Sequence, residues 1–200
     1  MTTPLRRLLS LFLIGALLGT LGDSMHVAAG VLGYSPPTIL GEKPWVPLLM
    51  GLGFINLVEG QAFWRARWPR SDESASTSAM VLAAAAFLAA WAATALFWRH
   101  PGPLTLALVA LYFAWPGALQ PRVLLSAVLT AALGPGVEAT LSFTGAFEYY
   151  TGHLFLGVPL WLPALYLHAA MAGRFVELRF PSALPWARRA GAAPQGTPAR

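Results

Sequence analysis

Six apolar stretches separated by short polar segments occupy most of this chain of 200 residues. A helix needs about 20 mostly apolar residues to span the hydrocarbon core of a bilayer. Only 10% of the residues are charged, against roughly 25% in soluble domains, and a soluble chain this short could not bury so much apolar surface. The sequence therefore predicts an all-α membrane protein, a bundle of about six transmembrane helices. The expected spans are residues 8–32, 45–63, 79–98, 104–119, 123–143 and 158–175.

Polar, glycine and proline residues mark where these spans end or break. Paired prolines at 36–37 cannot continue a helix and close the first span. Tryptophan interleaved with arginine at 64–70 closes the second, a mixture favoured at membrane interfaces. The glycine–proline–glycine sequence at 134–136 predicts a kink or a broken helix in the fifth. The domain is expected to cover residues 8–179, followed by a disordered cytoplasmic tail at 180–200.

The first apolar run resembles a secretion signal at its start. Arg6 and Arg7 precede the apolar stretch Leu8–Leu21, as the n-region of a signal peptide precedes its h-region. No convincing small-residue cleavage site follows, and the apolar character continues to Leu32. We therefore interpret this run as a retained first helix, with residues 1–7 as the N-terminal segment.

Basic residues are distributed asymmetrically over this map. Of the 13 lysines and arginines, only Lys43 and Arg99 fall in loops on one side of a six-span bundle. The others lie in the N-terminal segment, the second and fourth loops and the tail. Because basic residues remain cytoplasmic, both termini are predicted to be cytoplasmic. We therefore attribute the net charge of +5 to the basic residues that set the orientation in the membrane. No nucleic-acid partner is expected.

Ionisable side chains at membrane depth are costly, so each one is a candidate functional residue. Asp23 and His26 lie three residues apart, on one face of the first span. They could form a proton-holding pair, or they could simply be hydrated near the outer end of a long helix. Glu138 and His168 lie in the middle of the fifth and sixth spans, where they could be functional or could pair as structural glue. Glu59, near the inner interface, is expected to be solvated.

Several classes of function lack support in the sequence. No Gly-rich phosphate loop, His-Glu-x-x-His motif or nucleophile elbow is present. The four histidines are scattered and the chain has no cysteine, so neither a metal site nor a cofactor is expected. A small transporter would need polar groups near the midplane of several helices, and only Glu138 and His168 clearly qualify.

The stretch Gly145–Thr151, followed by Trp161-Leu162-Pro163, resembles the insulin-induced gene (Insig) family. That family has a Gly-x-aromatic-Gln-Tyr-Thr stretch and then a Trp-Leu-Pro opening of its last helix. The order and lengths of the six apolar segments agree as well. The resemblance implies a bundle that encloses a lipid-facing cavity for an apolar lipid, sterol-like or diacylglycerol-like, often in an oligomer, so a homo-oligomer is one expected assembly. The candidate ligand-binding residues are Asp23, His26, Glu138, Tyr149, Trp161 and His168.

The chain departs from the animal members of that family in the turn after its fourth span. Those proteins have an Asp-Arg-Ser-Arg-Ser-Gly turn that contacts a sterol-sensing partner, whereas residues 115–122 here read WPGALQPR. The pair Asp23 and His26 is not part of the animal pattern either. The resemblance therefore does not carry that protein partner over to this chain.

A second, weaker resemblance is to bacterial membrane proteins of carotenoid biosynthesis. Those proteins pair a buried glutamate with a Gly-x-Phe-Gly-x-Tyr-x-Tyr loop and a Gly-Val-Pro helix start, which Glu138, residues 145–150 and residues 157–159 partly match. This reading implies an enzyme in which Glu138 protonates an isoprenoid double bond with help from His26 or His168. Lipid binding without catalysis is the leading hypothesis, and the expected location is the bacterial inner (plasma) membrane.

Overall fold

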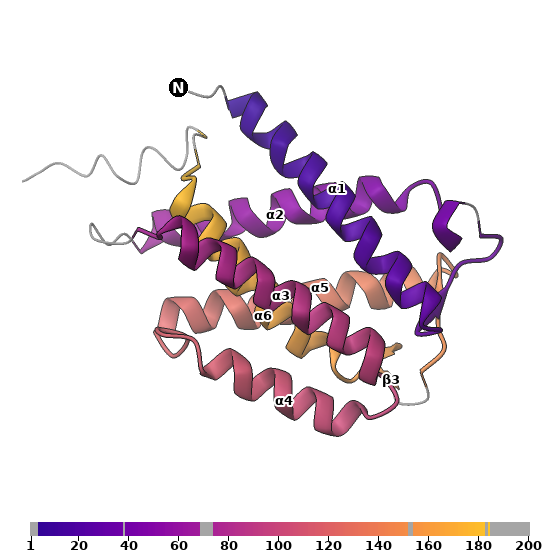
Figure 1. Ribbon diagram of the computed structural model, residues 1–200. Helices are drawn as coiled ribbons and strands as arrows, with labels where there is room; N and C mark the ends of the chain where they lie inside the picture. The colour runs from indigo at the N-terminus through magenta and orange to yellow at the C-terminus, as the bar shows by residue number, and fades with distance from the viewer. Residues whose placement is uncertain (1–3, 38, 69–73, 152–153, 183, 185–200) are drawn as a thin grey trace, which may run out of the picture.

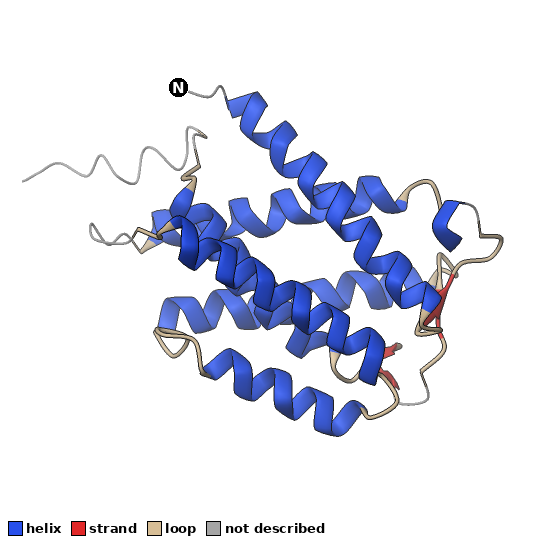
Figure 2. Cartoon of the chain, in the orientation of Figure 1, coloured by secondary structure: helices blue, strands red, loops and turns tan. Residues whose placement is uncertain are grey.

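The computed structural model describes residues 4–37, 39–68, 74–151, 154–182 and 184. Six α-helices dominate this part of the chain, and short strands occur only at one end of the bundle (Figure 2). The helices are α1 (Pro4–Ala28), α2 (Val46–Arg67), α3 (Thr77–Phe97), α4 (Pro101–Phe113), α5 (Pro121–Phe143) and α6 (Leu162–Arg179), with a short 3₁₀ helix η1 (Ile39–Gly41). The prediction of an all-α bundle of six helices is confirmed.

Four of these helices, α1, α2, α3 and α5, are long and apolar enough to cross a membrane. Helix α4 has only 13 residues, and both of its ends come earlier in the chain than the expected span at 104–119. It begins earlier, because Pro101 and Pro103 fit the first helical turn instead of a loop. It ends earlier, at Phe113, because the following turn contains Pro116 and Gly117, and Gly117 has a φ of 79°.

Helix α6 is the central helix of the bundle. It packs against α2, α3, α4 and α5 (Figure 1), and most of its side chains are buried. Small residues allow this close packing, since the buried face of α6 includes Ala164, Ala169, Ala170, Ala172 and Gly173. Helix α1 lies outside this group, against α2 and α3. Gly15 and Gly19 bring its backbone against Phe54 and Met50 of α2.

Helix α5 continues without interruption through Pro135, so of the two expected alternatives the broken helix is wrong, while a kink stays a prediction. A proline removes one backbone hydrogen bond, which packing against a neighbouring helix can offset. Pro135 is buried, and the aromatic ring of Tyr166 from α6 lies against the backbone at Gly134. The glycine thus admits a ring from the central helix at the level of the proline.

Two small antiparallel ladders close the end of the bundle where α1 ends and α6 begins. β1 (Leu32–Gly33) pairs with β2 (Glu148–Tyr149), and β3 (Leu154–Phe155) pairs with β4 (Val158–Pro159). The first helix therefore stops at Ala28, before the expected end of its span. The sixth starts at Leu162, after the expected beginning of its span. The first ladder ties the segment after α1 to the segment after α5, and Tyr150 N also donates to the Val31 carbonyl oxygen at 2.8 Å.

The two ends of the described chain meet at the opposite end of the bundle (Figure 1). Arg7, in the first turn of α1, donates from Nη2 to the Phe180 carbonyl oxygen, just past α6, at 3.1 Å. The first turn of α1 and the segment after α6 therefore lie at the same end of the bundle. That both termini are cytoplasmic stays a prediction. The expected disorder of the tail concerns residues that lie largely outside the described part of the chain.

We expect Gly134→Ala to destabilise the protein and Gly136→Ala to leave it unchanged or slightly more stable. A Cβ at position 134 would overlap the Tyr166 ring, whereas a Cβ at 136 meets no atom within 4 Å. Overpacking of this kind costs about 1–3 kcal/mol, while alanine gains up to about 1 kcal/mol in helix propensity. Thermal unfolding of both variants in the same detergent measures the difference. Equal melting temperatures would show that the contact between Gly134 and Tyr166 is unimportant.

Candidate functional site

Asp23 is buried near the C-terminal end of α1. Its side chain is 5% exposed, and Oδ2 accepts a hydrogen bond from the Tyr34 hydroxyl at 2.7 Å. Tyr34 comes back over the end of α1 because the chain turns into β1 directly after the helix. Burial raises the pKa of Tyr34 above its usual value, so its hydroxyl remains a donor. The interpretation of Asp23 as a hydrated residue is therefore wrong.

His26 is equally buried and has partners on α3. Trp91 donates its indole N–H to Nδ1 at 3.3 Å. Because an indole nitrogen can only donate, Nδ1 must be the unprotonated acceptor. The proton then lies on Nε2, which is 2.9 Å from Thr94 Oγ1. The Thr94 hydroxyl donates a hydrogen bond to the Trp91 carbonyl oxygen at 2.6 Å. His26 is thus a neutral imidazole whose hydrogen-bond partners are on α3. The alternative prediction, that His26 is hydrated near the outer end of the first helix, is wrong.

Trp161 packs against the other side of His26. The two ring centroids are 5.5 Å apart, and the Trp161 side chain is 0% exposed. Its indole Nε1 is buried, and among the residues that the structure describes it has no hydrogen-bond partner. A buried polar group without a partner usually costs about 1–3 kcal/mol. Trp161 is therefore a donor in the interior that can donate a hydrogen bond to an oxygen atom of a bound molecule.

Glu138 on α5 is held by two tyrosines. The Tyr149 hydroxyl, on β2, donates to Oε2, and the Tyr166 hydroxyl, on α6, donates to Oε1 at 2.6 Å. The suggested pairing of Glu138 with His168 is wrong, because His168 Nε2 lies 2.8 Å from the Leu108 carbonyl oxygen of α4. Since a carbonyl can only accept, that nitrogen of His168 carries the proton.

An aromatic chain connects the Asp23 and Glu138 parts of the site. Tyr34 packs on Phe147 with ring centroids 5.8 Å apart, and Phe147 packs on Tyr149 at 5.3 Å. The hydrogen bonds and ring contacts thus join groups from α1, α3, α5, α6 and the first ladder. We call this set the interior polar cluster; its members are Asp23, His26, Tyr34, Thr94, Glu138, Tyr149, Trp161 and Tyr166.

The structure brings together five of the six candidate ligand-binding residues and separates the sixth. His168 faces α4 and lies beside Tyr112, with ring centroids 6.4 Å apart. Sequence reasoning missed Tyr34, Thr94 and Tyr166 as members of the cluster. The sequence signal that could have found them is a hydroxyl side chain within reach of a buried polar residue. Only the folded chain shows that they contact Asp23, His26 and Glu138.

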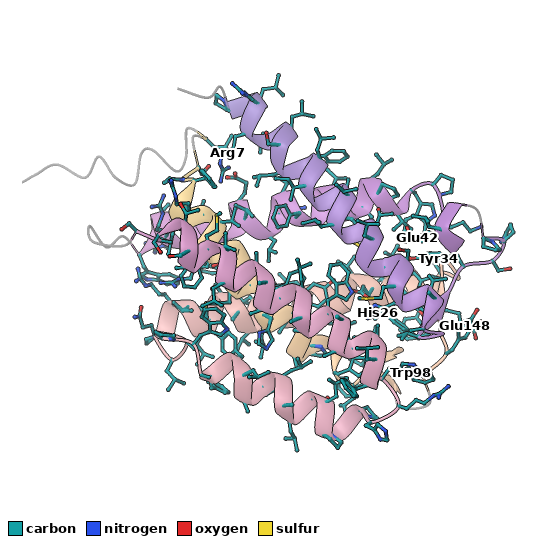
Figure 3. The ribbon with its side chains drawn as sticks, viewed as in Figure 1. Arg7, His26, Tyr34, Glu42, Trp98 and Glu148 are labelled. Atoms are coloured by element: carbon teal, nitrogen blue, oxygen red, sulfur yellow. The ribbon has the colours of Figure 1, made fainter. Side chains whose placement is uncertain are left out.

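Glu42 extends the acidic character of this end of the bundle. It lies in the segment between η1 and α2, is 2% exposed, and sits next to Tyr34 beyond the end of α1 (Figure 3). Burial, with a smaller contribution from the Asp23 carboxylate, raises the pKa of Glu42 to about 8. Glu42 therefore adds a second buried carboxyl group near Asp23 at this end of the bundle.

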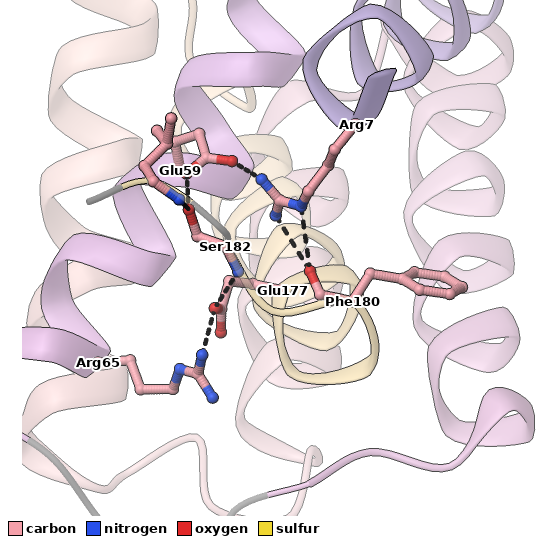
Figure 4. Close-up of polar contacts among 7 residues, drawn as sticks. Arg7, Glu59, Arg65, Glu177, Phe180 and Ser182 are labelled. Carbon is pink, nitrogen blue, oxygen red and sulfur yellow. Dashed lines mark hydrogen bonds and ion pairs between the residues drawn. The ribbon is translucent and has the colours of Figure 1, made fainter. Parts of the chain in front are cut away.

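Glu59 is not solvated as expected. It is 9% exposed and forms an ion pair with Arg7 of α1 (Figure 4). Its Oε2 also accepts a hydrogen bond from Ser182 Oγ at 2.6 Å. The residue lies at the end of the bundle opposite the interior polar cluster, where it connects α2 with α1 and with the segment after α6. Its role there is structural.

No group of three His, Asp or Glu side chains within the described ranges could hold a metal ion. His100 precedes α4 and is exposed. His153 lies outside the described residues.

No family model matches the chain. A protein of Mycolicibacterium vanbaalenii described as an INSIG protein homolog is 30% identical over an alignment of 181 residues, and the match covers 84% of this chain and 84% of that protein. The chain belongs to the Insig family. Two crystal structures of the mycobacterial Insig homolog MvINS match with a TM-score of 0.71 at 27% identity, covering 87% of this chain and 95% of theirs. One of them is a cross-linked trimer.

Family membership agrees with the resemblance found at residues 145–151 and 161–163. Together with four helices that are long and apolar enough to cross a bilayer, it identifies this Insig family member as a multi-pass integral membrane protein. The bacterial relative supports the bacterial plasma membrane as its location.

We expect Glu138→Gln to lower the thermal stability of the protein, with Glu148→Gln as the matched control. Glutamine offers one acceptor oxygen where the carboxylate offers two, so either Tyr149 or Tyr166 loses its partner in a buried site. The cost is about 1–3 kcal/mol. Glu148 is exposed, and its substitution should change the melting temperature little. If the two variants melt alike, the two tyrosine hydrogen bonds do not stabilise the fold.

Proposed function

We propose that this Insig family member binds a neutral, apolar lipid, with the oxygen-bearing end of the lipid at the interior polar cluster. The observation that carries the proposal is the indole N–H of Trp161, which is fully buried and has no acceptor among the described residues. Lipid hydrocarbon offers no hydrogen bonds, so a donor at this depth is retained at a cost. A hydroxyl or ester oxygen of a lipid would provide the missing acceptor.

The chemistry of the cluster favours a neutral ligand over a charged one. Its members include the carboxyl groups Asp23 and Glu138 and the neutral imidazole of His26, and no lysine or arginine. An anionic headgroup would meet like charge without a counter-ion. A lipid with one or two hydroxyl or ester groups, sterol-like or diacylglycerol-like, fits donors and acceptors of this kind.

The alternative function, an isoprenoid enzyme with Glu138 as general acid, has less support. A general acid must direct its proton at the substrate. Both oxygens of Glu138 instead accept hydrogen bonds from tyrosines, an arrangement that suits a carboxylate held as an acceptor. His168, one of the two histidines that this hypothesis names as helpers, hydrogen-bonds to α4 and lies apart from Glu138.

We also propose that the protein assembles as a homo-oligomer in the membrane. The support is the cross-linked trimer of the homologous MvINS, whose chain this one matches over 95% of its length. The mass of the intact assembly reports its number of chains directly, so one experiment addresses assembly and ligand together.

We expect native mass spectrometry of the detergent-purified protein to show a neutral lipid bound to the wild type and to Trp98→Phe, and a reduced amount on Trp161→Phe. Loss of one buried hydrogen bond should weaken retention about fivefold to tenfold. Trp98, at the end of α3, is only partly buried and serves as the matched tryptophan. Ligand-free wild type, or undiminished lipid on Trp161→Phe, would contradict the proposal. A released isoprenoid product would favour the enzyme instead.

A further inference from the structure

Asn56 lies on an exposed face of α2, at the middle of this helix of 22 residues. Within the described part of the chain its side-chain amide forms no hydrogen bond, neither with another helix nor with the backbone of α2. The hydrocarbon of a bilayer offers an amide no partner at this depth. A single chain therefore leaves the donors and the acceptor of Asn56 unsatisfied.

Two glycines lie on the same face of α2, one turn before and one turn after this asparagine. Gly53 precedes Asn56 by three residues and Gly60 follows it by four, which places all three on one side of the helix. A Cβ added at either glycine would meet no atom within 4 Å. Gly173 of α6, by contrast, admits the Leu57 side chain of α2. Packing within the chain thus gives no reason for glycine at positions 53 and 60.

Two large apolar side chains flank these three residues. Leu52 is 54% exposed and Phe63 is 53% exposed, and their spacing from Asn56 places both on the same side of the helix. Helix α2 packs against α1 and α6 through its other sides (Figure 1). We call this set the open face of α2; its members are Leu52, Gly53, Asn56, Gly60 and Phe63.

The same face on a second copy of the chain can supply the hydrogen bond that Asn56 lacks. A carboxamide carries two donor hydrogens and an acceptor oxygen, so asparagines of identical chains around a symmetry axis can satisfy one another. Small residues let membrane helices approach closely enough for such a bond. A lipid chain that filled the space beside the glycines would leave the amide without a partner. The homologous MvINS has been crystallised as a cross-linked trimer.

We propose that the open face of α2 is the contact between copies of this chain, with Asn56 of each copy hydrogen-bonded to Asn56 of the next. The inference rests on the homo-oligomer proposed above and adds where the chains meet. Gly53 and Gly60 admit the neighbouring α2 on either side of that hydrogen bond, and Leu52 and Phe63 pack around it. The symmetry axis of the assembly then runs along α2.

Helix α5 provides a matched face for comparison. Gly136 is exposed, and a Cβ there also meets no atom within 4 Å. Thr140, one turn further along, is exposed as well, but its hydroxyl donates to the Gly136 carbonyl oxygen at 2.8 Å. This face therefore has an open glycine beside a polar residue whose hydrogen bond is already formed. We expect no contact between chains there.

The first test is native mass spectrometry of the full-length protein over a range of protein-to-detergent ratios, which measures the fraction of oligomer. The α2 variants are Asn56→Leu and Gly60→Ile, and the matched controls are Thr140→Leu and Gly136→Ile on α5. All four add apolar surface on an exposed face, so the fold of the single chain should be retained. We expect about tenfold weaker association for each α2 variant and wild-type association for both controls.

Oxidative cross-linking in the membrane gives a second measurement, which does not depend on detergent. The chain has no cysteine, so a single introduced cysteine reports contact between copies. Gly60→Cys should form a disulfide-linked dimer, since a disulfide requires two Cα atoms within about 7 Å of each other. Thr140→Cys should remain monomeric on a denaturing gel.

Two results would overturn the inference, and they differ in what they leave standing. An oligomeric wild type with Asn56→Leu associated as strongly as Thr140→Leu would retain the homo-oligomer and place its contact elsewhere. A wild type that is monomeric at every ratio, with no cross-link in Gly60→Cys, would contradict the homo-oligomer as well. Weaker association of both α2 variants, together with the cross-link at position 60, would support the open face of α2 as the contact.

Discussion

The architecture depends on the lack of hydrogen-bond partners in the hydrocarbon of a bilayer. A polar side chain at membrane depth must find its partner inside the protein or lose its hydrogen bonds. Asp23 of α1 is satisfied by Tyr34, His26 by groups of α3, and Glu138 of α5 by tyrosines of β2 and α6. His26 therefore connects α1 with α3 and Glu138 connects α5 with α6, whereas Asp23 ties the segment after α1 back to that helix.

The two ends of the bundle have opposite chemistry because their polar groups are satisfied differently. Where α1 ends and α6 begins, acids are held by tyrosine hydroxyls and a histidine stays neutral, so the interior polar cluster contains no lysine or arginine. At the other end, acids are held by arginines: Glu59 by Arg7 and Glu177 by Arg65. A neutral lipid suits the first environment, whereas the second is a set of ion pairs between helices. Helix α6 contributes to both ends of the bundle, with Tyr166 at the first and Glu177 at the second.

The six helices were predictable from the sequence because hydropathy and proline positions are local signals. The first and last residues of α4 were harder to predict, since Pro101 could either end a loop or begin a helix. The packing of the Tyr166 ring of α6 against Gly134, next to Pro135, is a contact between helices that no local pattern reveals. The same applies to the site. Asp23, His26, Glu138, Tyr149 and Trp161 were identifiable as polar or motif residues, but the partnership of Asp23 with Tyr34 and the burial of Glu59 by Arg7 arise only on folding.

The environment of the Trp161 indole proton is the most direct measure of the proposed function. Its ¹H–¹⁵N resonance in detergent can be assigned by its loss in Trp161→Phe and followed as dioctanoylglycerol is added, with the Trp98 resonance as internal reference. A neutral lipid at the interior polar cluster should shift the Trp161 resonance saturably and leave that of Trp98 in place. An unchanged Trp161 resonance at saturating lipid, or equal drift of both resonances, would contradict the account.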